Sequence, residues 1–282
     1  MQFWPQFAPL SLDELGKELG TQRLGVKFHY LADVGSTNTY ARQLAEVGAR
    51  EGEVVIAETQ TQGRGRLGRH WHSPPFANLY LSVILRPNIS PAHAPQITLM
   101  AAVAVAETVS AFVPSGLAIK WPNDILLDGK KLAGILAEAA SGANRVEHVI
   151  LGIGVNLNGP VDSMPEEIRG RATALVEVTG KTVQRESFCR RLIQTLDRCY
   201  GELEQSGFDA LASRWSTYFA LRDQPVRVEL LDHILYGRAR GIDRQGALLV
   251  EEDSGALHRV IAGDVIPLKP DIKNHAFGHR YR

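Results

Sequence analysis

The sequence contains little cysteine, no excess of either charge and no long apolar run. Its only cysteines, Cys189 and Cys199, cannot form the disulfide framework of a small secreted protein, and their spacing is not that of a metal site. Both fall in an apparent helix, which favours buried thiols without a chemical role. Lysine and arginine together number 31, as do aspartate and glutamate, so no global charge attracts nucleic acid or membranes. Any basic site must therefore be local.

Targeting and membrane signals are also absent from the sequence. Residues 1–5 lack the basic and apolar regions of a signal peptide. The most apolar stretch, residues 97–106, is too short and too rich in alanine to span a bilayer. We therefore expect a cytoplasmic protein. Its 282 residues suffice for one large domain, or for a large and a small one, with ample core.

Helix and strand patterns are mixed along most of the chain. Residues 1–30 are expected to form a short extension with one amphipathic segment. The pattern predicts helices over 36–48, 95–109, 186–203 and 208–219, and strands over 53–58, 78–85, 117–120, 124–127, 131–138 and 146–153. Hairpins mixed with helices, without strict strand–helix alternation, favour an α+β fold.

The character of the chain changes near residues 220–224. Short strands separated by glycine turns are predicted around 226–230, 248–250 and 258–261, which indicates a small β-barrel or sandwich. We therefore expect four parts: an extension (1–30), a main domain (31–221), a small β domain (222–270) and a tail (271–282).

A loop rich in glycine and arginine carries the strongest chemical signal. The segment from Glu58 to Trp71 contains three glycines and three arginines, and no acidic residue occurs between positions 59 and 106. Its positive charge is not compensated, and its glycines leave the backbone free to wrap around a ligand. Such a loop is suited to closing over an anionic group. Its arginines are Arg64, Arg66 and Arg69.

Other interpretations of this loop are weaker or remain open. Residues 63–68 match the dinucleotide-binding fingerprint by letter, but no helix can readily begin after them and no acidic residue follows at the ribose-binding distance. A solvated basic loop without a ligand is an alternative. Arg-Gly repeats also occur in nucleic-acid-binding tails, although those are long and disordered, whereas this loop is short and lies between two predicted strands.

Three further segments carry residues suited to nucleotide chemistry. Residues 120–124 (Lys-Trp-Pro-Asn-Asp) put a cation, an amide and a carboxylate at one sheet edge, which suits a nucleotide and its magnesium; a plain turn is the alternative. Lys131 begins a strand that becomes apolar at once, so its ammonium is either partly dehydrated or an ordinary surface group. The glycines of residues 152–154 allow close approach to the backbone, or mark a β-bulge.

Taken together and in this order, the motifs are far more specific than any one alone. They are Ser36-Thr37-Asn38, the Gln-Gly-Arg-Gly-Arg loop, Lys-Trp-Pro-Asn-Asp, Gly-Lys-Lys-Leu-Ala-Gly-Ile and Gly-Ile-Gly-x-Asn. With them the sequence resembles the biotin protein ligase family (biotin–[acetyl-CoA-carboxylase] ligase) from about residue 30 to 270. The resemblance implies a class II synthetase-like catalytic domain with a mixed or antiparallel sheet, followed by a small SH3-like domain.

The resemblance also implies a reaction in two steps. Biotin and ATP, with Mg²⁺, would give biotinyl-5′-AMP and pyrophosphate. The biotinyl group would then pass to one lysine of a biotin carboxyl carrier protein. The first step joins two anions that repel unless cations lie between them, so the arginines and the lysine suit the chemistry. The mixed anhydride is easily hydrolysed, so a loop that closes over it would protect it from water.

Carried over by position, the motifs suggest a division of the site. Lys131 and Arg64 would be the catalytic cations, with Lys131 bridging the biotin carboxyl oxygen and the α-phosphate in both steps. Asp124 would also bind the metal. The residues expected at biotin are Ser36, Thr37, Asn38, Gln62, Arg64, Gly65, Arg66, Lys131, Gly134 and Gly152. Those expected at the nucleotide are Arg66, Arg69, Trp71, Asn123, Asp124, Lys131, Asn156 and Lys269. Lys269 stands where many members of the family carry an arginine.

One departure from the family bears on its partners. Bifunctional members begin with a DNA-binding winged helix-turn-helix, whereas only 35 residues precede Ser36 here, fewer than small domains usually need to fold unaided. We therefore expect a monofunctional form that binds no DNA and no membrane, although edge strands of the main sheet could pair in a homodimer. The rival functions are a lipoate or octanoyl ligase, and a non-catalytic module that binds phosphate or nucleic acid.

Overall fold

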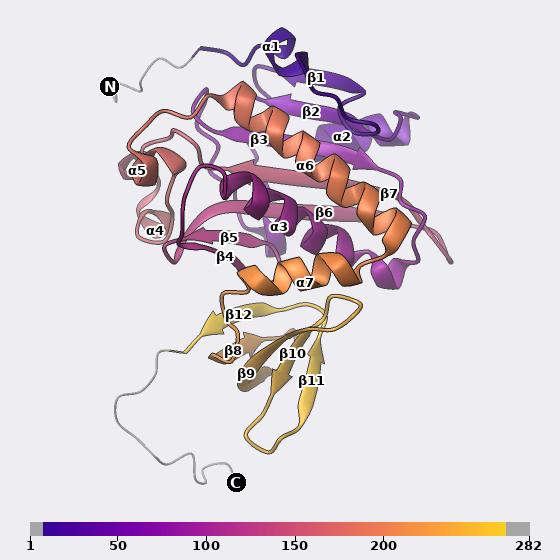
Figure 1. Cartoon of the computed structure of the whole chain (residues 1–282), viewed down its shortest axis with the longest axis vertical. Helices are drawn as coiled ribbons and strands as arrows, with labels where there is room; N and C mark the ends of the chain where they lie inside the picture. The colour runs from indigo at the N-terminus through magenta and orange to yellow at the C-terminus, as the bar shows by residue number, and fades with distance from the viewer. Residues whose placement is uncertain (1–7, 269–282) are drawn as a thin grey trace. The chain divides into compact units, whose positions relative to one another are not determined.

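The computed structural model describes residues 8–268, which divide into two units (Figure 1). The first unit extends to Ala220 and also includes residues 244–246. The second contains the described residues 221–243 and 247–268. The first division along the chain falls between Ala220 and Leu221. No helix within residues 8–268 has the length and apolarity needed to cross a bilayer.

The first unit contains one large sheet and the principal helices. Its helices are α1 (Leu12–Gly16), α2 (Thr37–Glu46), α3 (Pro95–Val109), α4 (Glu166–Arg169), α5 (Leu175–Thr179), α6 (Arg185–Ser206) and α7 (Asp209–Tyr218). Its strands are β1 (Lys27–Leu31), β2 (Glu53–Ala57), β3 (Leu79–Leu85), β4 (Leu117–Lys120), β5 (Asp124–Leu127), β6 (Lys130–Ser141) and β7 (Val146–Val155). Short 3₁₀ turns cover Arg66–Gly68, Pro91–His93 and Val161–Ser163.

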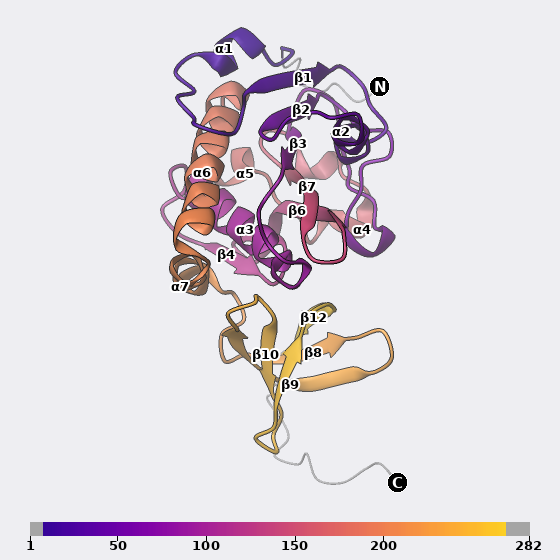
Figure 2. The ribbon, with the colours of Figure 1, turned by 90° about the vertical axis from the view of Figure 1, so that its right-hand side faces the viewer.

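The seven strands form a mixed sheet in the order β1-β2-β3-β7-β6-β5-β4, in which only β1 and β2 run parallel. Figure 2 shows the sheet between α3 and α6 on one side and α2 on the other. The α3 helix is buried almost throughout, because its alanines and valines let it pack closely against β4–β6 and α6. This arrangement confirms the α+β fold with a mixed sheet.

Residues before 31 belong to the first unit, although the sequence suggests only an extension. The β1 strand adds a parallel edge to the sheet beside β2, and α1 packs on α6. Leu15 and Leu24 are fully buried in this region. None of the residues of β1 is buried, in keeping with its place at the edge of the sheet. The two cysteines lie buried on α6, as expected.

A buried ion pair connects the residue after β2 to the first residue of α6. The guanidinium of Arg185 donates to both carboxylate oxygens of Glu58, at 2.6 and 3.2 Å, and their side chains are only 6% and 1% exposed. Glu58 also accepts from the backbone N–H of Leu10 and the hydroxyl of Tyr30. Burial and the neighbouring Glu58 carboxylate raise the pKa of Tyr30 to about 12. The network therefore joins four separate segments.

We expect Arg185→Leu to lower the free energy of unfolding by roughly 3–5 kcal/mol, because it leaves a buried carboxylate without its cation. Urea denaturation followed by circular dichroism measures the loss. Lys17→Met is the matched control: it breaks an exposed ion pair with Glu14, which water already screens, and should leave the stability nearly unchanged. Equal stability losses in the two variants would contradict this account of the buried pair.

The second unit is a five-stranded antiparallel sheet in the order β11-β10-β9-β8-β12. Its strands are β8 (Pro225–Glu229), β9 (Ile234–Ile242), β10 (Leu248–Glu251), β11 (Leu257–Val260) and β12 (Asp264–Pro267). The sequence does not reveal β9, because the alternate positions Gly237, Ala239 and Gly241 carry little or no side chain. At Gly237 a side chain would collide with the backbone of Glu251 on β10.

Candidate active site

Sheet register brings the predicted motifs to one face of the large sheet. Ser82 on β3 pairs with Gly152 on β7. Two residues further along β7, Gly154 pairs with Gly134 on β6, and Gly134 pairs in turn with Asp124 on β5. Paired residues in antiparallel strands point to the same face. This is the face that α2 covers, since a side chain at Gly152 would collide with Asn38 of that helix. At the positions of the three glycines the face carries no side chain of its own.

At one end of this face, Asn38 is held by the sheet. Its Nδ2 donates to Glu138 Oε2 at 2.7 Å and to the backbone oxygen of Leu136 at 3.2 Å. Its Oδ1 lies 2.6 Å from the hydroxyl of Ser82. Asn38 is only 4% exposed. The side-chain amide of Asn38 therefore already has partners, and these hydrogen bonds connect α2 to β3 and β6.

The other members of the Ser-Thr-Asn motif face the start of the loop. Gln60 Oε1 accepts from both the N–H and the hydroxyl of Thr37, at 2.9 and 3.1 Å. Ser36 precedes α2 and is buried, yet its side chain makes no capping hydrogen bond to the helix. Ser36 is thus the motif's best placed hydroxyl for a ligand. Gln62 is exposed, and its N–H donates to the backbone oxygen of Gly35.

We expect Gly152→Ala to weaken binding at this end of the site by about tenfold or more. The added methyl would overlap the side-chain oxygen of Asn38, whose amide is held on both sides and cannot easily move. Isothermal titration with biotin measures the effect. Gly142→Ala is the control, since Gly142 lies in the β6–β7 turn of the same hairpin. Unchanged affinity in Gly152→Ala would show that the close contact does not matter.

The glycine- and arginine-rich loop, residues 59–73 and hereafter the flap, is folded back on itself. The N–H of Gly65 donates to the backbone oxygen of Arg69 at 2.8 Å, and that of Trp71 to Gly63 at 2.9 Å. A side chain at Gly63 would strike the backbone oxygen of Trp71. A 3₁₀ turn forms the tip, where Leu67 adopts a positive φ of 56°. The lack of a side chain at Gly63 therefore allows the flap to fold back on itself.

The flap arginines reach opposite walls of the site. The Nη2 of Arg64 lies 3.1 Å from Glu138 Oε1 on β6. The Nη1 of Arg66 donates to Asn123 Oδ1 at 3.3 Å, in the turn between β4 and β5. Arg69 is exposed on the flap's outer limb. The flap therefore spans this face of the sheet, from the end near α2 to the turn between β4 and β5.

The indole of Trp71, itself a flap residue, lies against Gly134 and Gly154. A methyl group on Gly134 would lie 2.8 Å from its ring, and one on Gly154 would lie 2.5 Å from it. The ammonium of Lys131 is 5.4 Å from the centre of the same ring and 2.7 Å from Asp124 Oδ1. A lysine, a carboxylate and an indole are thus gathered at one point. Burial, and then the charge of His70, lowers the pKa of the adjacent His72.

The remaining predicted residues are placed less directly. The side-chain nitrogen of Asn123 donates a hydrogen bond to the backbone oxygen of Ile135, at 2.8 Å. Asn156 is buried and donates to the backbone oxygen of Thr173 at 3.0 Å, so it braces the segment after β7. Lys269 lies outside the described residues. Within residues 8–268, no three carboxylate, histidine or cysteine side chains gather as a metal site.

Sequence reasoning missed three residues that shape the site. Glu138, Gln60 and Ser82 support Arg64, Thr37 and Asn38. None stands in a recognisable motif, and each resembles an ordinary polar residue in a strand or loop. The register of β3 and β6 against α2 brings Ser82 and Glu138 to the site, and the loop after β2 brings Gln60.

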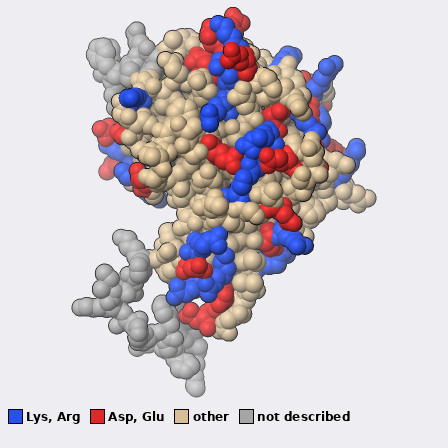
Figure 3. Space-filling model, viewed as in Figure 1, with Lys and Arg blue, Asp and Glu red and all other residues tan. Residues whose placement is uncertain are grey.

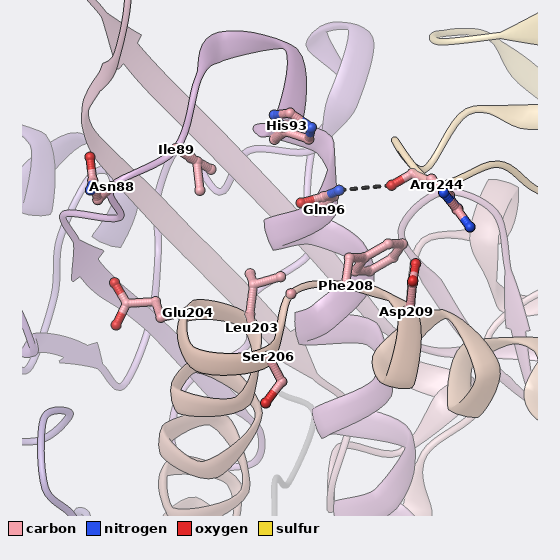
Figure 4. A pocket seen from close by; sticks show the side chains of 11 residues that line it. Asn88, Ile89, His93, Gln96, Leu203, Glu204, Ser206, Phe208, Asp209 and Arg244 are labelled. Atoms are coloured by element: carbon pink, nitrogen blue, oxygen red, sulfur yellow. Dashed lines mark hydrogen bonds between the residues drawn. The ribbon is translucent and has the colours of Figure 1, made fainter.

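A separate cavity of about 450 Å³ lies in the first unit, away from these residues. Figure 4 shows it beside the N-terminal end of α3 and the junction between α6 and α7. Gln96 donates to the backbone oxygen of Arg244 across one side, at 2.8 Å. None of the predicted site residues lines it.

Both units of the chain match known protein families. Residues 30–156 match the biotin/lipoate A/B protein ligase family, and residues 223–266 match the biotin protein ligase C-terminal domain. The chain is 37% identical to a bifunctional ligase/repressor of Bacillus spizizenii, over 91% of this chain and 78% of that protein. It is 36% identical to a biotin–[acetyl-CoA-carboxylase] ligase of Paracoccus denitrificans, over 80% of this chain and 94% of that protein.

A solved structure extends the similarity to three dimensions. The biotin protein ligase from Aquifex aeolicus, in complex with biotin and ATP, is 27% identical to this chain. The match covers 86% of this chain and 98% of that one, with a TM-score of 0.73. It therefore spans most of both folds.

Proposed function

This chain belongs to the biotin/lipoate A/B protein ligase family, and we propose that it is an ATP-dependent biotin protein ligase. It activates biotin as biotinyl-5′-AMP and transfers the biotinyl group to a lysine of a biotin carboxyl carrier protein. The arrangement of Lys131 carries this proposal. Its ammonium lies beside Asp124 and Trp71, and the flap arginines Arg64 and Arg66 contact Glu138 and Asn123 of the same site.

In the first step a carboxylate oxygen of biotin attacks the α-phosphorus of ATP. The bond from that phosphorus to the β-bridging oxygen breaks, and pyrophosphate leaves. Lys131 supports this step because its ammonium lies where the two anions are proposed to meet. When the substrate binds, the ammonium exchanges its contact with Asp124 for contacts with the substrate. Arg64 and Arg66 add charge from the flap, which also keeps water from the product. Ser36 is the buried hydroxyl proposed to bind the ureido ring of biotin.

In the second step the lysine amine of the carrier attacks the carbonyl carbon of the adenylate. An amide bond forms, AMP leaves, and the amine loses a proton. The positive groups that favoured the first step stabilise the charge on the leaving phosphate. Trp71 supports nucleotide binding through its flat indole, which lies over Gly134 and Gly154.

Mg²⁺ fits this site as a companion of the phosphates. Such an ion usually takes one or two carboxylates together with phosphate oxygens and water, and it does not need a cage of protein ligands. Asp124 supplies one carboxylate, and the described residues gather no cluster of three. When bound, the ion neutralises phosphate charge. Asp124 would hold it from the β5 side, with Asn123 beside it.

The rival functions predict different surfaces and substrates. A non-catalytic phosphate or nucleic-acid module predicts a broad basic surface, but on the face in Figure 3 lysines and arginines are interspersed with acids. A lipoate or octanoyl ligase shares the family match of residues 30–156. The match of residues 223–266 to a biotin protein ligase C-terminal domain favours biotin.

Finer properties are part of the same proposal. We infer that the carrier is the biotin domain of acetyl-CoA carboxylase or of another biotin enzyme, and that the protein acts in the cytoplasm. We infer further that it binds no operator DNA. A homodimer paired through sheet edges is compatible with β1 and β4 as the edge strands.

The proposal is tested by mixing the protein with biotin, ATP, Mg²⁺ and a biotin carrier domain, followed by probing with streptavidin. We expect a labelled carrier that depends on ATP, and no labelling when lipoate replaces biotin and lipoyl-specific antibody replaces streptavidin. A carrier that stays unlabelled, while a known biotin ligase labels the same preparation, would reject the proposal. A gel shift with DNA from its own operon tests the absence of operator binding.

A further inference from the structure

Glu138 stands at a junction of charges that the proposed reaction does not explain. Its Oε1 lies 2.7 Å from Arg42 Nη2 and 3.1 Å from Arg64 Nη2, and its Oε2 accepts from Asn38 at 2.7 Å. The Glu138 side chain is only 20% exposed. One half-buried carboxylate therefore lies between two guanidinium groups.

The two arginines differ in the element that carries them. Arg42 lies on α2, four residues after Asn38, so both side chains share one face of a rigid helix. Arg64 lies on the flap and has a more exposed side chain, at 44%. Glu138 itself is fixed in β6, where it pairs with Ile150 of β7. Arg42 and Glu138 thus have backbones held in a helix and a strand, whereas the backbone of Arg64 lies in the loop between β2 and β3.

This asymmetry allows Arg64 to change partners. When a carboxylate or phosphate arrives, Arg64 can turn to it because Arg42 still neutralises Glu138. Without Arg42, the departure of Arg64 would leave a half-buried carboxylate unpaired, which is costly. Arg42 thus makes the release of Arg64 easier, and Glu138 holds Arg64 near the site until the substrate comes.

We infer that Glu138 is a positioning residue that holds Arg64 of the flap over the empty site and releases it to the anionic substrate, with Arg42 as the cation that remains. This inference rests on the proposed function for the identity of the substrate, biotin with ATP. The holding contact itself concerns the ligand-free protein and can be measured without any activity.

The test uses two variants that should shift the flap in opposite directions. Glu138→Gln keeps the shape and can still accept from Asn38, but it loses the charge that holds Arg64. Arg42→Gln leaves Arg64 as the only remaining guanidinium on Glu138. In the ligand-free full-length protein, trypsin should cut after Arg64 roughly tenfold faster in Glu138→Gln than in the wild type. In Arg42→Gln it should cut more slowly than in the wild type.

Two readouts separate this role from a merely structural one. Fragment masses identify the cut after Arg64, and thermal unfolding confirms that both variants remain folded at the assay temperature. In the biotinylation assay, Arg42→Gln should raise the KM for biotin and Glu138→Gln should lower it, each with kcat within about twofold, a change smaller than one hydrogen bond to a charged group would give.

The outcomes distinguish this inference from the proposed function. If both variants shift the cut after Arg64 in the same direction, or Glu138→Gln does not speed it, Glu138 does not hold the flap. If the wild-type protein makes no biotinyl-adenylate while the two cutting rates diverge as expected, the proposed function fails and the contact stands.

Discussion

Lys131→Met is expected to slow biotinyl-adenylate formation by roughly 10³-fold, the upper range for losing one electrostatic contact to a reacting group. The ammonium lies 5.4 Å from the centre of the Trp71 ring, and Met retains most of the length of the side chain without its charge. Radiolabelled pyrophosphate exchange measures the first step directly. The fold should persist, since Lys131 is 36% exposed and its pair with Asp124 adds little to stability.

Lys130→Met is the matched control for this prediction. Lys130 is the neighbouring lysine in β6, but it is exposed, and a register shift in the β5–β6 pairing puts Lys131, not Lys130, on the face that carries Gly134. Its removal should change the exchange rate by less than about twofold, well below the effect of a charge at the reacting centre. Near-normal exchange in Lys131→Met, or equal losses in both variants, would show that Lys131 does not bridge the two anions.

Arg66→Gly is expected to turn the protein into a leaky ligase. The substitution removes the link between the flap and Asn123 on the opposite wall, so the adenylate should escape roughly ten- to hundredfold faster, the effect of losing a hydrogen bond to a charged group. Free biotinyl-adenylate acylates exposed lysines without selection. Streptavidin blots of a mixture containing a bystander protein should therefore show labelling beyond the carrier. Arg64→Gly should act in the same direction, because it removes the flap cation that is proposed to turn from Glu138 to the anionic ligand.

Leu67→Gly provides the control within the same loop. Leu67 is an exposed side chain at the tip with a positive φ, so glycine relieves strain there and changes no charge. If this variant leaks as much as Arg66→Gly, backbone flexibility and not the arginine opens the flap. If labelling stays confined to the carrier in both arginine variants, the flap does not retain the adenylate.

Much of the fold could be predicted from local patterns. Helix α3 and strands β4 and β5 begin and end where proline, glycine turns and apolar runs indicate. The strands β1, β9 and β12 could not be predicted in this way. In β9 the alternate positions are glycine and alanine, and β1 lies at an edge where no residue is fully buried. Their pairing depends on neighbouring strands and not on their own composition.

The candidate site divides along the same line. The sequence reveals the types of group present, because charge and backbone freedom are local properties. These groups are the flap arginines, which no acidic residue accompanies in the neighbouring sequence, a lysine at the start of a strand, and an Asn-Asp pair after proline. Their partners do not. Glu138 is an ordinary polar position in the sequence, yet register against β7 and contact with α2 put it between Arg42 and Arg64.

The sequence by itself determined the chemistry of this protein: which cations it can present to an anion, and that a glycine-rich loop presents them. Only the tertiary structure decided where each cation points. Long side chains such as Arg64 and Arg66 can reach many partners, and the choice depends on which carboxylate or amide the packed sheet brings within about 3 Å, the range of a hydrogen bond. That proximity arises from strand register and helix packing between residues far apart in the chain.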